Sequence, residues 1–159
     1  MRNIPEQRID SKAVPYWRWS ASIKTGFLLL IPAGYHMARQ HWHWPAWITF
    51  VLLGLTLAYA VYAILFRPAI TWRTWRYEVS EQEIDLMHGV FIKTRTLIPM
   101  VRVQHVDTEQ GPLLRCFGLS SVTISTAAGS HEIPALADQV AVRLRDQISV
   151  LARVVDEDV

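Results

Sequence analysis

A run of 22 residues without a charged side chain, from Pro45 to Phe66, limits the folds open to this chain more than any other segment. As a helix the run is roughly 33 Å long, which is enough to cross the ~30 Å hydrocarbon core of a bilayer. The alternative is a helix in the core of a soluble domain, but such a helix usually keeps a polar face. We therefore expect a transmembrane helix over residues 45–66.

A second apolar segment precedes the first, and it is weaker. Its uncharged part, Thr25–Met37, contains Pro32 and Gly34 and taken alone also fits a core helix or a re-entrant segment. If Lys24 reaches back to the membrane interface, the span extends over about residues 19–37 and is long enough to cross. A signal peptide fits poorly, because the charged leader is long and a second span follows at once. The sequence thus predicts a transmembrane helical hairpin over residues 19–66.

The basic residues around these segments predict an orientation. Eight lie in the flanks, whereas the connecting loop Ala38–Trp44 carries only Arg39. The eight are Arg2, Arg8, Lys12, Arg18, Lys24, Arg67, Arg73 and Arg76. By the positive-inside rule both termini are expected in the cytoplasm, with residues 1–18 as a cytoplasmic N-terminal segment. The lipid bilayer is then the first partner, and the basic flanks would attract anionic headgroups.

Aromatic and histidine residues crowd around the same segments. All seven tryptophans fall between Trp17 and Trp75, as is typical of chains that meet a membrane interface. The side chains expected at the interface are Trp17, Trp19, Lys24, Trp42, Trp44, Arg67 and Arg73. Three histidines, His36, His41 and His43, lie in or beside the loop, but their spacing is not that of a zinc site, so no metal is expected.

Residues 67–155 read as one small β-rich domain, followed by a tail at residues 156–159. Short alternating runs predict antiparallel strands at residues 76–80, 84–88, 90–98, 101–106, 119–126 and 131–134. Asp138 is expected to cap a final helix, in which Val140, Leu144, Ile148, Leu151 and Val155 form one apolar stripe. We interpret that helix as covering a curled sheet. A helix lying on the membrane surface is the alternative.

Four short motifs of this domain resemble a known family. The runs Ile98–Val106 (IPMVRVQHV), Gly111–Leu113 (GPL), Arg115–Leu119 (RCFGL) and His131–Leu136 (HEIPAL) are similar to the signature of bacterial pleckstrin-homology-like membrane proteins, the YdbS-like family. The resemblance covers nearly the whole chain and implies an α+β membrane protein: two transmembrane helices, then a PH-like antiparallel β-barrel capped by a C-terminal helix. It also implies that the protein is located in the bacterial cell (inner) membrane. Cys116 departs from the family pattern, in which polar or basic residues are common there.

The motif supplies the candidate binding residues Arg102, Gln104 and Arg115. Arg102 and Gln104 alternate with apolar residues and are expected on one face of an extended stretch. Arg115 is expected at the surface of a turn that buries Phe117. These side chains either bond to loop carbonyls and hold the corner of the fold, or bind a ligand or partner.

Several classes of chemistry have no support in the sequence. There is no Gly-rich phosphate loop, HExxH, GxSxG or paired-cysteine motif, and no cofactor is expected. Cys116 and His105 lack a third group to orient them as a nucleophile and base, and a lone apolar-flanked cysteine is more often a buried small hydrophobe. The net charge of +2 is too small to indicate nucleic acid as a partner.

Two function classes remain. The first is a non-enzymatic, membrane-anchored module whose cytoplasmic domain binds a protein partner, a second copy or related PH-like protein, or an anionic headgroup. The second is a subunit of a membrane assembly in envelope stress or export, in which the small residues Gly26, Gly34, Gly54 and Ala58 pack against other helices. An enzyme is the poorest interpretation.

Overall fold

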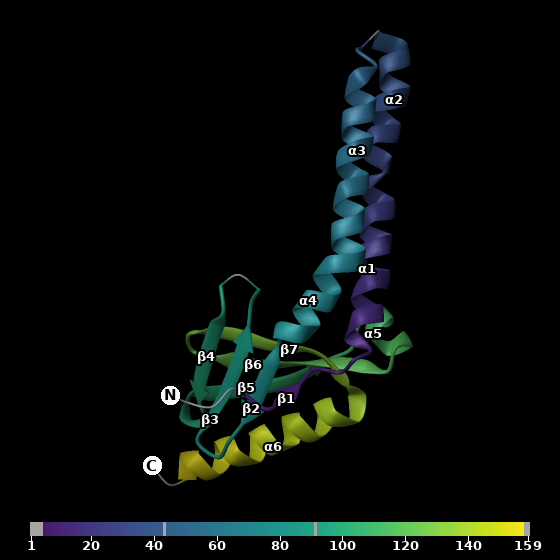
Figure 1. The fold of residues 1–159 in the computed structure, drawn as a ribbon. Coiled ribbons are helices and arrows are strands. Elements are labelled where there is room, and N and C mark those ends of the chain that lie inside the picture. Colours follow the sequence, from purple (N-terminus) through teal and green to yellow (C-terminus); the bar gives the residue numbers. More distant parts are fainter. Residues whose placement is uncertain (1–4, 43, 91, 158–159) are drawn as a thin grey trace. The chain divides into compact units, whose positions relative to one another are not determined.

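A computed structural model describes residues 5–42, 44–90 and 92–157. His43 of the loop, Arg2 of the basic flank and Phe91 of an expected strand lie outside the described residues. The chain forms two compact units: residues 14–69 make one, and the residues up to Ala13 together with those from Ile70 onward make the other. Each unit is described below by itself (Figure 1).

The first unit is a helical hairpin. Its outgoing arm consists of α1 (Ala13–Leu28) and α2 (Leu30–Trp42), and its returning arm begins with α3 (Trp47–Val61). The two helices of the outgoing arm join at Leu29, where the N–H of Leu29 still donates to Thr25 and its carbonyl still accepts from Ala33. The break follows from Pro32, which has no N–H to donate to the carbonyl of Leu28.

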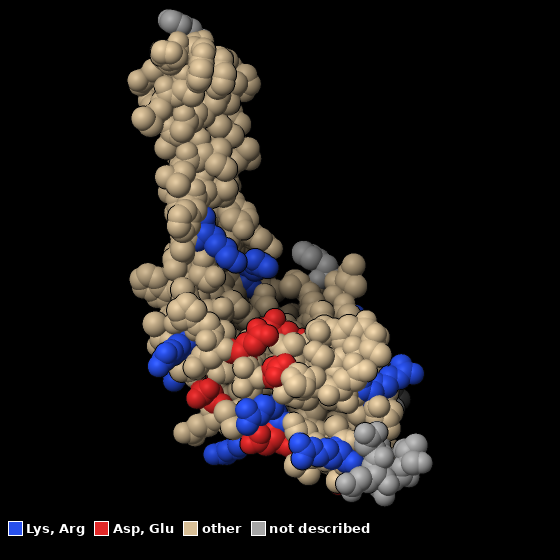
Figure 2. All heavy atoms as spheres, turned by 180° about the vertical axis from the view of Figure 1, so that it is seen from behind, with Lys and Arg blue, Asp and Glu red and all other residues tan. Residues whose placement is uncertain are grey.

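The returning arm contains a helix long and apolar enough to cross a membrane. It runs from Trp47 to Thr74 through α3, one π-helical turn (Tyr62–Phe66) and α4 (Arg67–Thr74), with a mean hydropathy of 2.2 in its most apolar window. By length and composition it is the single such helix among the described residues. On the face that Figure 2 shows, the surface of the hairpin is largely uncharged.

The second unit contains two antiparallel sheets. The first has the strand order β1-β2-β3-β4, with β1 at Gln7–Arg8, β2 at Arg76–Val79, β3 at Glu83–His88 and β4 at Thr94–Pro99. The second has the order β5-β6-β7, with β5 at Val103–Glu109, β6 at Leu119–Thr126 and β7 at Gly129–Ala137. A 3-10 turn (Met100–Arg102) links the sheets, helix α5 (Pro112–Cys116) joins β5 to β6, and α6 (Asp138–Glu157) follows β7. The α+β class is confirmed, whereas a closed barrel is not seen in these sheets.

The core of this unit lies under α6, which packs against all three strands of the second sheet and against the 3-10 turn. Alternation within strands supplies Ile84, Leu86, Val122, Ile124 and Ile133, each at most 2% exposed. The helix contributes Ala141, Leu144 and Ile148. The expected stripe is therefore wrong at its start: Val140 is 42% exposed, and Ala141 takes the inward position.

Two further local expectations are corrected. The strand expected over residues 90–98 begins only at Thr94, because Gly89, with φ +112°, opens a turn in which Val90 and Ile92 are exposed. Val101 is exposed as well, since the 3-10 turn interrupts the alternation on which the expected apolar face depended.

The N-terminal segment is part of the second unit, which sequence patterns did not predict. Strand β1 extends the first sheet by pairing with β2, and Ile9 beside it is 3% exposed. The Ile9 carbonyl accepts from the Trp72 indole (3.2 Å), and the guanidinium of Arg8 lies 5.9 Å from the centre of a ring of Trp72. The N–H of Asp10 donates to the carbonyl of Ala135, at the β7 bulge.

Candidate functional site

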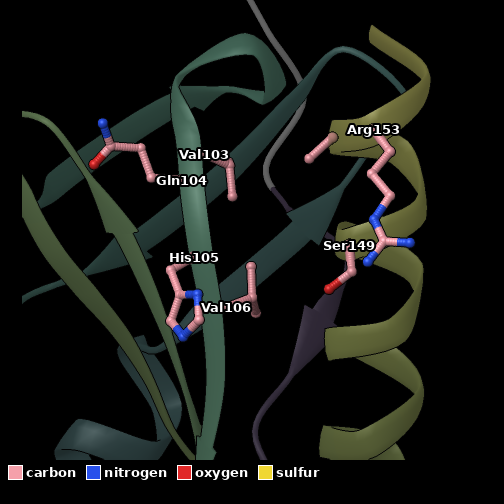
Figure 3. A pocket seen from close by; sticks show the side chains of 7 residues that line it. Val103, Gln104, His105, Val106, Ser149 and Arg153 are labelled. Carbon is pink, nitrogen blue, oxygen red and sulfur yellow. The ribbon is translucent and has the colours of Figure 1, made fainter. Parts of the chain in front are cut away.

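A hollow in the described part of the chain lies between β5 and α6 (Figure 3). It has a volume of about 330 Å³. Four residues of β5 and three of α6 line it: Val103, Gln104, His105, Val106, Ser149, Ala152 and Arg153. The valines point from β5 toward α6, while the glutamine and histidine lie on the other side of the strand. The hollow thus has an apolar floor along the strand and a polar rim on the helix.

A bulge in β5 produces this floor. Val103 pairs with Thr126 and His105 with Ser125, so Gln104 is the extra residue of the strand. In a regular strand, residues three apart point to opposite faces; the extra residue brings both Val103 and Val106 to the side of α6. The apolar side chains at odd spacing in VRVQHVD were the available sequence signal for this bulge.

Strand β5 is also a sheet edge. Among the described residues it pairs with β6 on one side, and no strand lies on the other. An edge strand presents backbone N–H and C=O groups that can bond to another extended chain. The hollow therefore combines an open strand edge with a helix face, which is a geometry suited to a peptide segment.

The three candidate residues from the motif do not form one cluster. Gln104 lines the hollow, and Arg102 ends the preceding 3-10 turn with its side chain exposed. The expectation that these two share a face of an extended stretch is wrong, because the turn and the bulge break the alternation between them. Arg115 lies on α5, beyond the other end of β5, roughly 20 Å along the strand.

Helix α5 and the turn after it form a separate corner. Pro112 occupies the first turn of α5, where a missing N–H is harmless, and Gly118 ends the corner at φ +64°. Arg115 is exposed, as expected, whereas Phe117, which was expected to be buried, is only half-buried. Cys116 is exposed, which contradicts its interpretation as a buried small hydrophobe. The short helix turns its side chain outward.

The carboxylate of Asp138, which was expected to cap the final helix, bonds instead to side chains of the second sheet and of the segment before α5. Asp138 is the first residue of α6, and its carboxylate accepts from the hydroxyl of Ser120 (2.7 Å) and from the Gln110 amide (3.5 Å). Ser120 is 2% exposed, so this bond satisfies a buried hydroxyl and ties the start of α6 to β6. The position of α6, and with it one wall of the hollow, depends on this contact.

Two polar pairs of the strands escaped sequence reasoning. The Arg95 guanidinium donates to both oxygens of Asp85 across β3 and β4, at 2.9 and 3.1 Å from its Nε, and this carboxylate raises the pKa of Arg95. On β5, His105 lies 3.1 Å from Asp107, and both are largely exposed. The Asp85–Arg95 pair joins neighbouring strands, so only the register reveals it. His105 and Asp107 are two residues apart on β5, and that spacing was the available sequence signal for the second pair.

The expected interface residues lie on the hairpin and its ends. Trp19, Trp42 and Trp44 are 47–62% exposed, Lys24, Arg67 and Arg73 are exposed, and Trp17 is half-buried. At the hairpin tip Trp44 stacks between Tyr35 and Trp42, with ring centroids 5.6 Å apart in each pair. The hydroxyl of Tyr35 donates to the Pro45 carbonyl (3.1 Å). No group of three or more histidine, cysteine or acidic residues is placed to hold a metal within the described ranges.

Comparisons with known proteins agree with this architecture. Residues 25–152 match the family described as Bacterial PH domain. The chain is 46% identical over its full length, and over that of the relative, to the UPF0699 transmembrane protein YdbS of Bacillus subtilis (strain 168). It is 26% identical over 98 residues to the UPF0699 transmembrane protein YdbT of the same organism; the match covers 62% of this chain and 19% of YdbT. No solved structure matches the chain.

Proposed function

This chain belongs to the bacterial PH domain family, as a YdbS-like transmembrane protein, and from that premise we propose that it is a membrane-anchored binding module. Its PH-like domain holds an extended segment of a partner protein in the groove between β5 and α6. The observation that carries this proposal is the open edge of β5 beside the hollow of about 330 Å³. We assign the two sheets and α6 to the PH-like domain that the family implies.

Strand addition at β5 supplies both affinity and selectivity. The free backbone groups of β5 would bond to the added segment, and the alternate side chains of that segment would enter the hollow over Val103 and Val106. Ser149 and Arg153 on α6 offer a hydroxyl and a cation to its polar groups. The membrane anchor confines the domain to a surface, so a modest intrinsic affinity suffices for a partner in the same membrane.

The test is site-specific photocrosslinking in the intact full-length protein. A benzoylphenylalanine in place of Ala152, which lines the hollow, should capture a discrete partner segment, either from a second copy or from another protein. The matched control places the same group at Val150, which is 61% exposed and does not line the hollow. Equal capture at both positions, or none at Ala152, would contradict the proposal.

Both chain termini are proposed to lie in the cytoplasm of a bacterial cell. Support comes from the basic flanks and from the fold of the second unit. The chain leaves that unit at Ala13 and returns to it at Ile70, so the segment between must cross the membrane an even number of times. A two-pass hairpin satisfies this condition, with α1 and α2 together as the first pass.

Labelling with a membrane-impermeant maleimide tests this topology. The native Cys116 should react only after cells are permeabilised. A cysteine replacing the exposed Gln40 at the hairpin tip, in a Cys116→Ser background, should react on intact cells. Protection at both positions would mean that the hairpin does not cross, and the reverse pattern would invert the orientation.

A second candidate function is a subunit of a membrane assembly in envelope stress or export. One observation favours it: a Cβ added at Gly26, Gly34 or Gly54 meets no atom within 4 Å, so the hairpin does not use these glycines for its own packing. Ala58 is exposed too. Replacing Gly54 and Ala58 by leucine should then dissociate a complex measured by mass in mild detergent. A complex that survives this change would remove the support.

We propose that the domain has no enzymatic activity and holds no resident cofactor. The polar residues that line the groove are Gln104, His105, Ser149 and Arg153, and Asp107, which pairs with His105, lies on the same strand. Assaying the purified full-length protein with phospholipids tests this point, since hydrolysis or transfer of a lipid group would reverse it.

A further inference from the structure

A second hollow of the domain has a different chemistry from the β5–α6 groove. It lies where the end of α4, the start of β2 and the turn between β3 and β4 meet, and its volume is about 180 Å³. Four of its lining residues are basic or can become so: Arg73, Arg76, His88 and Lys93. None of the residues that line it is acidic.

The cations of this hollow have few partners within the protein. Arg73 and Lys93 are exposed, and neither forms an ion pair with any residue that the structure describes. Arg76 donates one long bond to the carbonyl of Pro5 (3.4 Å). The ring of His88 stacks on Trp75 at 5.2 Å, which fixes it at the wall of the hollow. Unpaired cations around a concave site favour an anion.

An apolar turn adjoins the cations. Gly89 lines the hollow at φ +112°, and Val90 and Ile92 after it are 46% and 82% exposed. Ile92 is thus the most exposed of the apolar side chains in this turn that the structure describes, and Lys93 follows it directly. Apolar side chains next to lysine and arginine are typical of surfaces that enter the headgroup layer of a bilayer.

Chain connectivity limits how far this hollow can lie from the membrane. Arg73 belongs to the same helix as the proposed returning span, and the step from Phe66 to Arg73 is about 10 Å at 1.5 Å per residue. The headgroup layer on each side of the hydrocarbon core is roughly 5–8 Å thick. The cation is therefore held close to the lipid phosphates. A lipid in the anchoring membrane reaches the hollow more readily than a free anion.

We propose that this cationic hollow binds the phosphate of an anionic phospholipid, and that Ile92 enters the bilayer beside it, docking the domain on the membrane surface. The inference rests on the proposed membrane hairpin but not on the peptide groove. It also differs from the candidate ligand or partner site at Arg102, Gln104 and Arg115, since none of these residues lines this hollow.

The test uses the full-length protein in lipid nanodiscs of phosphatidylcholine with and without phosphatidylglycerol. Ile92→Cys in a Cys116→Ser background carries a polarity-sensitive fluorophore. Its emission should shift to the blue when phosphatidylglycerol is present, and the shift should weaken with added salt. Replacing both Arg73 and Lys93 by glutamine should abolish the shift.

The matched control replaces Arg143 and Arg145, two arginines of α6 that line neither hollow, by glutamine, so that the net charge falls equally. The control should keep the shift. The proposal is overturned if the control also loses the shift. It is likewise overturned if the emission wavelength does not change when phosphatidylglycerol is present. A blue shift produced by inorganic phosphate in nanodiscs of pure phosphatidylcholine would assign the hollow to free anions. That result would overturn the proposal that its ligand is a phospholipid. Crosslinking at Ala152 reports separately on the peptide groove, so the two failures are distinguishable.

Discussion

Truncating Ile9 tests whether the segment before the hairpin is a structural part of the domain. The side chain is 3% exposed, and the backbone around it bonds to Trp72 and to Ala135. Replacing a buried isoleucine by alanine lowers the free energy of unfolding by about 2–5 kcal/mol in protein cores. Because Ile9 lies beside a two-residue edge strand that can partly collapse, we expect the lower half of this range, about 2–3 kcal/mol.

The assay is thermal unfolding of the full-length protein in mild detergent, followed by tryptophan fluorescence. For a domain of about 100 residues, 1 kcal/mol corresponds to roughly 4–8 °C, so Ile9→Ala should lower the Tm by about 10–20 °C. Gln7→Ala is the matched control: its side chain is exposed on β1 and should change stability by less than about 0.5 kcal/mol. If both variants melt with the wild type, the N-terminal segment does not belong to the core. The argument for an even number of crossings then falls too.

Three further changes have expected outcomes. Gly89→Ala places a Cβ 1.9 Å from the Ile92 carbonyl at a φ of +112° and should cost about 1–3 kcal/mol, whereas Gly111→Ala, in open space, should be near neutral in the same melts. Ser120→Ala deprives the carboxylate at the start of α6 of its 2.7 Å bond and should cost about 1.5–3 kcal/mol, but Ser130→Ala, at the exposed start of β7, should not. Burial raises the pKa of Tyr77 above 10.0, so the unfolded chain loses this proton first; stability should be constant below about pH 10 and fall as the pH rises toward the folded-state pKa. Tyr77→Phe should flatten that decline in melts at pH 9 to 11, and an unchanged decline would contradict the assignment.

The two proposals assign separate tasks to the two hollows. In the first, a strand edge and a helix face recognise a protein segment, and in the second, unpaired cations recognise the membrane. A domain docked on the bilayer would hold its β5–α6 groove at a fixed height, which raises the effective concentration for a partner anchored in the same membrane. Variants at Ala152 and at Lys93 separate these tasks experimentally.

The sequence determined the elements whose signal is local. The uncharged run at residues 45–66 and the period-two runs that became β2, β3 and β6 each carry their own pattern of burial, because a helix or strand repeats with a fixed period. Residues 119–126 were predicted with the bounds that β6 has. The family motifs placed these elements in order along almost the whole chain.

The tertiary structure decided everything that depends on which segments meet. β1 is two residues long and has no pattern of its own; it exists because β2 offers an edge and Trp72 a donor. The bulge at Gln104 lets Val103 and Val106 both face α6, and Arg102 and Arg115 are separated because β5 runs between them. The two hollows share this origin. Each is formed by residues far apart in sequence, which the period of one element cannot bring together.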